Sequence, residues 1–108
     1  MNVTLRDLVE YETSNGKSPF SEWLLGLKDI SARAVIRKRL NRIRIGNFGN
    51  TRSIGDGVFE LKIDYGPGYR VYYGLDGDTL VVLLCGGDKG SQDRDIQKAK
   101  KYWQDYRR

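Results

Sequence analysis

The alternation of apolar and polar residues predicts a β-hairpin in the middle of the chain. In the stretch FELKI, which begins at Phe59, apolar and charged residues alternate, so Glu60 and Lys62 share the face opposite the apolar side chains. In YRVYY, which begins at Tyr69, Arg70 lies on the polar face in the same way. The intervening YGPG carries the glycines and the proline of a turn. The pattern therefore predicts two antiparallel strands, each with one apolar face.

The register of this hairpin follows from its apolar faces. Pairing Ile63 with Tyr69 keeps those faces together, whereas a slip of one residue would place Ile63 beside the charge of Arg70. The favoured register sets Lys62 directly opposite Arg70, which costs a few tenths to about 1 kcal/mol because like charges repel. That cost is offset if Glu60 lies diagonally between the two cations, or if the face holds an anion. One interpretation of the pattern is therefore that this face binds an anion.

The rest of the chain shows the periodicities of three helices and three further strands. Helix starts are indicated by Ser18 and Asp29 as N-caps, by Pro19 at a first helical position, and by Ser91 as the cap of the last helix. The predicted helices run over residues 19–28, 30–45 and from 91 onward, and the further strands over 5–12, 51–54 and 79–85. The last of these strands is apolar on both faces, so we expect it to be the most buried. The stretch GGDKG that follows it predicts a glycine-rich corner.

These elements predict one α+β domain that spans residues 1–108. The expected fold is a mostly antiparallel sheet of four to five strands, with an N-terminal helical hairpin on one face and a C-terminal helix. A chain of 108 residues is long enough to bury about two thirds of its unfolded surface as a single domain.

Composition narrows the chemistry that the domain can perform. The net charge of +5 favours an anionic partner, and the single cysteine, Cys85, excludes an internal disulfide and a cysteine-cluster metal site. The absence of histidine removes the commonest general base, the commonest metal ligand and every Ser–His or Cys–His nucleophile. No apolar run approaches the ~20 residues of a membrane helix, and the N-terminus lacks a signal-peptide pattern. We therefore expect a cytoplasmic protein without membrane contact, metal or cofactor.

Four stretches, taken in order, resemble a known family. They are YETSNGKSPFSEWLLGLKD, RLNRIRIGNFGNTRSIGDGV, GVFELKIDYGPGYRVYYGL and LLCGGDKGSQDRDIQKAKKYW. Together they cover nearly the whole chain and resemble the HigB-like branch of the RelE/ParE superfamily, often labelled addiction module killer proteins. The resemblance implies the toxin of a type II toxin–antitoxin pair, a small basic domain that enters the ribosomal A site, cuts mRNA there and so inhibits translation.

The resemblance also implies partners and alternatives. A cognate antitoxin protein, expected to be a helix-turn-helix protein encoded next to the toxin, holds such toxins inactive, and DNA is contacted only through the antitoxin complex. Another branch of the superfamily poisons DNA gyrase by protein binding. A third alternative is a non-catalytic member that binds only its antitoxin. Fold alone does not separate these functions, and the ribosome-dependent endoribonuclease is the leading hypothesis.

Metal-independent RNA cleavage makes three demands on the side chains. The ribose 2′-hydroxyl is deprotonated, charge on the phosphorane is stabilised, and the leaving 5′-oxygen is protonated. Arginine stays protonated and clamps phosphate, whereas a lysine crowded by other cations can have its pKa lowered. By position, the resemblance places catalytic basic residues at Arg70, Lys62 and Lys89, which we expect to converge on one concavity open to solvent. The simpler alternatives are an Arg70–Glu60 pair, an exposed strand lysine at 62 paired with Glu60 or Asp64, and a solvated loop lysine at 89.

Three more residues are candidates for RNA contact. Arg94, in the first turn of the last predicted helix, is placed to meet phosphate or to form a salt bridge on the helix surface. Glu60 is either an acid–base group or a support for Arg70. RelE-like proteins carry an aromatic residue after the last strand that stacks on a base, and this chain has none directly there. Tyr72, on the Arg70 face by parity, is a substitute for stacking or a packing residue.

Overall fold

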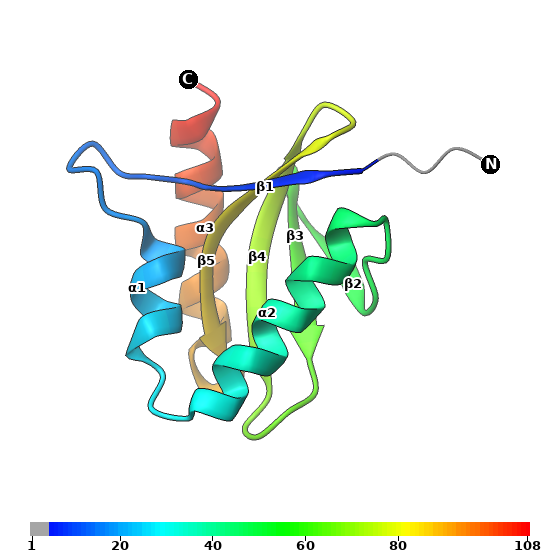
Figure 1. The fold of residues 1–108 in the computed structure, drawn as a ribbon. Helices are drawn as coiled ribbons and strands as arrows, with labels where there is room; N and C mark the ends of the chain where they lie inside the picture. Colours follow the sequence, from blue (N-terminus) through cyan, green and yellow to red (C-terminus); the bar gives the residue numbers. More distant parts are fainter. Residues whose placement is uncertain (1–4) are drawn as a thin grey trace.

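The computed structural model describes residues 5–108, and the first four residues of the predicted domain lie outside that range. Within it, the chain forms one sheet with helices on both faces (Figure 1). The elements in chain order are β1 (Asp7–Glu10), α1 (Pro19–Gly26), α2 (Ile30–Arg44), β2 (Thr51–Gly55), β3 (Val58–Ile63), β4 (Tyr69–Asp76), β5 (Leu80–Asp88), the 3-10 helix η1 (Lys89–Ser91) and α3 (Gln92–Tyr106). The strand order is β1-β5-β4-β3-β2, with β1 parallel to β5 and the other neighbours antiparallel. The predicted α+β class with a mostly antiparallel sheet is confirmed.

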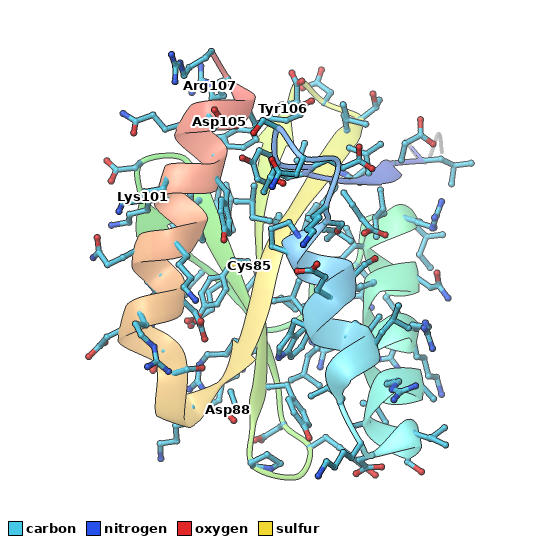
Figure 2. The ribbon with its side chains drawn as sticks, turned by 90° about the vertical axis from the view of Figure 1, so that its left-hand side faces the viewer. Cys85, Asp88, Lys101, Asp105, Tyr106 and Arg107 are labelled. Carbon is cyan, nitrogen blue, oxygen red and sulfur yellow. The ribbon has the colours of Figure 1, made fainter. Side chains whose placement is uncertain are left out.

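Helices α1 and α2 cover one face of the sheet and α3 covers the other, as the turned view in Figure 2 shows. On the first side, residues such as Ile36 of α2 pack in one core with Leu61 of β3. On the second side, Trp103 of α3 packs in a separate core with Tyr72 of β4. The polar face of the β3–β4 hairpin therefore lies on the α3 side of the sheet.

The β3–β4 hairpin has the register that its apolar faces predict. Ile63 pairs with Tyr69, and Lys62 pairs with Arg70. A one-residue slip would have turned the apolar residues of one strand away from those of the other, so burial of a shared apolar face selects this pairing. The two cations lie opposite each other on the α3 side of the sheet.

Strand β5 is longer than the sequence predicts. The stretch GGD, expected to begin a corner, continues the strand to Asp88 and pairs with β4. Glycine is needed here because side chains pack on the backbone from both faces. An added Cβ would overlap the Trp23 ring at Gly86 and the Asp95 carboxylate at Gly87. The corner itself is the short helix η1.

The start of α3 also differs from the prediction, because Ser91 does not cap the helix. The Ser91 hydroxyl donates to the buried carboxylate of Asp95 instead, and it makes no capping hydrogen bond. Asp88 caps η1 by accepting a hydrogen bond of 2.8 Å from the N–H of Gly90. The turn into α3 is thus stabilised by two carboxylates rather than by a serine cap.

The two N-terminal helices begin at the predicted caps. The side chain of Ser18 accepts a hydrogen bond from the N–H of Ser21 at 3.1 Å, and that of Asp29 accepts one from Ala32 at 3.2 Å. Helix α1 and strand β1 are both shorter than predicted. No helix within residues 5–108 combines the length and the apolar character that a membrane crossing requires.

Gly74 of β4 lies directly against the indole of Trp103, where an added Cβ would overlap ring carbons. Gly74→Ala is expected to lower the free energy of unfolding by about 1–3 kcal/mol, because a buried ring has to shift. Chemical denaturation measures the change. Gly26→Ala is the control, since a Cβ there meets nothing within 4 Å and alanine favours helix. A Gly74→Ala protein as stable as the wild type would contradict this packing.

Candidate functional site

A polar cavity of about 320 Å³ lies on the α3 side of the hairpin, where β2, β3 and β4 meet the start of α3. Its lining residues are polar or charged: Asn50, Arg52, Glu60, Lys62, Arg70 and Gln92. Three cations and one carboxylate face it, so the cavity carries a net positive charge. Positive charge in a partly enclosed space attracts anions more strongly than the same charge spread over an open surface.

Glu60 is a buried carboxylate with three hydrogen-bond donors. It accepts hydrogen bonds from Arg52 Nε at 2.9 Å, from the Tyr72 hydroxyl at 3.0 Å and from Gln92 Nε2 at 3.0 Å. Only 3% of its surface is exposed. Burial by itself would raise the pKa of Glu60, but the hydrogen bonds that it accepts outweigh burial and lower the pKa below its usual value. Glu60 is therefore ionised at neutral pH.

Arg70 is a buried cation with two guanidinium nitrogens that make no hydrogen bond. Its Nε lies 3.7 Å from Glu60 Oε2, which is an ion pair but too long for a hydrogen bond. Both Nε and Nη1 are buried and have no hydrogen-bond partner among the described residues. Leaving such donors unpaired costs about 1–3 kcal/mol each. A guanidinium held in this way beside a polar cavity is suited to pairing with an anion.

The structure brings some of the predicted site residues together and separates others. Lys62 is exposed, lies opposite Arg70 and lines the same cavity as Glu60. Lys89 and Arg94 line a different cavity, of about 280 Å³, at η1 and the start of α3. We expected Lys62, Arg70 and Lys89 to line one concavity. In the structure, Lys62 and Arg70 line one cavity and Lys89 lines another.

The two cavities are neighbours rather than remote sites. Gln92 lines both of them. The backbone N–H of Lys89 donates to the carbonyl of Gly68 at 3.1 Å, which ties the corner to the loop of the β3–β4 hairpin. The cavity lined by Arg70, Glu60 and Lys62 is called the Arg70 cavity from here on. Lys89 lies beside it without lining it.

Tyr72 lies beneath the cavity, where it supports Glu60. Its side chain is fully buried and its hydroxyl donates to Glu60. Burial, followed by the negative charge of Glu60, raises the pKa of Tyr72, so the phenol stays protonated and remains a donor. The ring offers no exposed surface on which a base could stack. The geometry favours the packing alternative for this residue.

Tyr72→Phe tests this support. Removing the hydroxyl takes a hydrogen bond from a buried carboxylate and is expected to lower the free energy of unfolding by about 1.5–3 kcal/mol. Tyr73→Phe is the matched control, because the neighbouring Tyr73 hydroxyl pairs with the neutral hydroxyl of Thr51 at 2.6 Å and its loss costs about 0.5–1.5 kcal/mol. Urea denaturation of both variants gives the comparison. Equal losses would show that Glu60 gains nothing special from Tyr72.

Sequence reasoning missed three residues of the cavity, namely Asn50, Arg52 and Gln92. A signal for Arg52 was present, because pairing the predicted strand 51–54 with the hairpin sets Arg52 opposite Glu60, as the structure does. No signal identified Gln92, whose contact with Glu60 spans 32 residues of the chain. That contact depends on where α3 crosses the sheet.

Other reactive groups lie outside this cavity. Cys85, labelled in Figure 2, is a buried free thiol. Burial, followed by the charge of Asp95, raises the pKa of Cys85 to about 12, so the thiol is protonated at neutral pH and is a poor nucleophile. Within residues 5–108, His, Cys, Asp and Glu form no group of three or more that could hold a metal ion.

The fold and the cavity define a small α+β protein that presents a buried arginine at the end of a β-hairpin. The chain belongs to the family of phage-derived Gp49-like proteins (DUF891), which matches residues 22–104 and so includes every residue of the cavity. An uncharacterized protein of Haemophilus influenzae is 53% identical over 81 residues, which covers 75% of this chain and 82% of that protein.

Proposed function

We propose that this protein is the toxin of a type II toxin–antitoxin pair and acts as a metal-independent, ribosome-dependent mRNA endonuclease. The observation that carries the proposal is the pair of buried, unpaired donors on Arg70, beside a cavity with net positive charge. Membership of the Gp49-like family and the resemblance to HigB-like toxins support it.

The cavity is chemically suited to the phosphate that links two nucleotides. The Arg70 guanidinium, which lines the cavity, donates to a non-bridging oxygen and so gives a cation with unpaired donors an acceptor of opposite charge. Lys62 approaches from the exposed side of the cavity. Glu60 faces Arg70 and is held by its three donors, so it orients the guanidinium and balances one positive charge without filling the cavity.

The proposed reaction is an internal transfer that needs no added nucleophile. The ribose 2′-oxygen loses its proton and attacks phosphorus, the bond from phosphorus to the 5′-oxygen breaks, and that oxygen takes up a proton. The products are a 2′,3′-cyclic phosphate and a 5′-hydroxyl. Arg70 stabilises the charge that develops on the phosphorane. In the proposal, the exposed Lys62 amine takes the proton from the 2′-oxygen and returns it to the 5′-oxygen.

The rest of the molecule supplies contacts for a large anionic target. Helix α2 carries six cations and no acidic residue: Arg33, Arg37, Lys38, Arg39, Arg42 and Arg44. In the proposal this helix contacts ribosomal RNA phosphates, so binding weakens as the salt concentration rises. The cognate antitoxin, encoded next to the toxin, prevents this association in the cytoplasm.

The test is induced expression of the wild type and of Arg70→Ala and Lys62→Ala, followed by mapping of mRNA 5′ ends. The wild type is expected to arrest growth and create new ends inside translated codons, and both variants are expected to lose those ends. Lys17→Ala, which changes an exposed loop lysine outside the cavity, is the control and should behave as wild type. Growth arrest without new ends would overturn the nuclease proposal and favour a toxin that acts by protein binding, such as a gyrase poison.

A further inference from the structure

A third cavity, of about 760 Å³, lies where α3 meets the β2–β3 turn and is not used by the proposed reaction. It is lined by residues of α3, by the residue that follows α3 and by the β2–β3 turn: Asp56, Gln97, Lys100, Lys101, Trp103, Gln104 and Arg107. It shares no lining residue with the Arg70 cavity. Figure 2 shows Lys101 and Arg107 toward the C-terminal end of α3, away from Asp88 at the end of β5.

The indole of Trp103 contributes a buried donor to this region. Its six-membered ring lies against Gly74 of β4, and its N–H edge lies against Gly57 of the β2–β3 turn. The residue is 4% exposed, and Nε1 has no hydrogen-bond partner among the described residues. A buried N–H without a partner is uncommon and costs free energy, so it calls for an explanation. The turn beside it, through Asp56, forms one wall of the cavity.

Charge on the cavity walls is mainly positive. Lys100, Lys101 and Arg107 face it, and Asp56 is the one carboxylate among its lining residues. Asp56 is itself 76% exposed at the side chain and pairs with Lys100 at 3.6 Å. A single long ion pair at an exposed position contributes little to stability. Lys100 can therefore exchange this partner for a ligand at small cost.

We propose that this cavity binds the phosphate group of a nucleotide or of an RNA end. A phosphate offers several acceptor oxygens and up to two negative charges, which matches three cations and an indole donor better than a single carboxylate does. The volume is within the range of small-molecule sites and leaves room for the rest of a nucleotide. Lys100 leaves Asp56 for a phosphate oxygen, the turn at Gly57 moves, and the Trp103 N–H donates to the ligand.

The proposed phosphate site is separate from the Arg70 cavity, because the two share no lining residue. A bound phosphate would pair with the indole donor of Trp103 and with the cations along one side of α3. A ligand at this site would also join α3 to the β2–β3 turn, whose link through side-chain charge is otherwise the Lys100–Asp56 pair.

The test follows the two indole N–H signals, those of Trp23 and Trp103, by NMR of the ¹⁵N-labelled protein. The probes are inorganic phosphate, adenosine 5′-monophosphate, and one trinucleotide with and without a 5′-phosphate, all at constant ionic strength. The Trp103 signal is expected to shift saturably with the phosphorylated probes and the Trp23 signal to stay in place. Tighter binding of the mononucleotide would identify a free nucleotide as the ligand, and tighter binding of the phosphorylated trinucleotide would identify an RNA end.

Variants show whether the phosphate binds at this site or in the Arg70 cavity. The double variant Lys100→Ala/Lys101→Ala is expected to weaken binding roughly tenfold or more, because two charged contacts are lost. Lys98→Ala changes an exposed lysine of α3 outside the cavity, and both Lys98→Ala and Arg70→Ala are expected to keep the wild-type shift of the Trp103 signal. A Trp103 signal that does not move, or that moves equally in the double variant, would overturn the proposal. Loss of the Trp103 shift in Arg70→Ala would also overturn the proposal, because it would show that the phosphate binds in the Arg70 cavity.

Discussion

Arg70→Met is expected to reduce mRNA cleavage by about 10²–10³-fold while leaving the free energy of unfolding unchanged or higher. The loss of activity follows from the proposed role of the guanidinium, which stabilises charge on the phosphorane. The stability follows from burial, because Arg70 carries two unpaired donors and makes only a long ion pair. Methionine fills similar space without a desolvated charge. Glu60 keeps its other three donors in this variant.

The two measurements are cleavage on translating ribosomes and urea denaturation of the purified protein. Arg108→Met is the matched control, since that side chain is 80% exposed and should change neither quantity. If Arg70 served only to pair with Glu60, the variant would lose stability and keep its activity. That result would remove the observation on which the proposed function depends.

Glu60→Gln is expected to lower the free energy of unfolding by about 3 kcal/mol, close to the cost of breaking a buried ion pair by removing one partner. The amide has nearly the same shape, but it leaves Arg70 as a buried cation without its facing negative charge. The amide nitrogen would also face donors that now meet a carboxylate oxygen. Adding Arg70→Met to this variant should restore part of the lost stability, because it removes the uncompensated cation.

The stability that Glu60 contributes depends on pH in a defined direction. Its pKa is lower in the folded protein than the ordinary value of 4.5. The contribution is therefore complete above about pH 4.5 and is lost as the pH falls through the lower, folded-state value. The difference between wild type and Glu60→Gln, measured by urea denaturation from neutral pH to pH 3, should shrink below pH 4.5. Glu12→Gln, at an exposed site, is the control, and a difference that stayed constant over this range would contradict the expectation.

The β3–β4 hairpin could be predicted from the local pattern of apolar and polar residues. Alternation predicted both strands, their facing residues and the meeting of Lys62 with Arg70, all of which the structure has. A period of two leaves only two choices of face, and burial of one face decides between them. Strand β5 shows the limit of the same reasoning. Gly86 and Gly87 suggested a corner, but the structure uses them where Trp23 and Asp95 pack on a continuing strand.

The site was predictable to a smaller extent. Parity placed Glu60, Lys62 and Arg70 on one face, and the structure places them in one cavity. The solvent exposure of these side chains was not predictable, because it depends on how α3 covers the sheet. Arg70 was expected to be open to solvent, but it is only 7% exposed. The position of Lys89 also depends on α3. The short helix η1 leads into α3 and places Lys89 at the neighbouring cavity, outside the Arg70 cavity.

By itself, the amino-acid sequence determined the periodic segments, the caps of the first two helices and the pairing of the central hairpin. Each of these depends on residues close together in the chain and on one apolar face that has to be buried. Only the tertiary structure decided that Gln92 meets Glu60, that the Arg70 donors are buried without partners, and that the Trp103 indole lies under the β2–β3 turn. These features depend on the path of α3 across the sheet, which packing between distant segments sets and no local periodicity encodes.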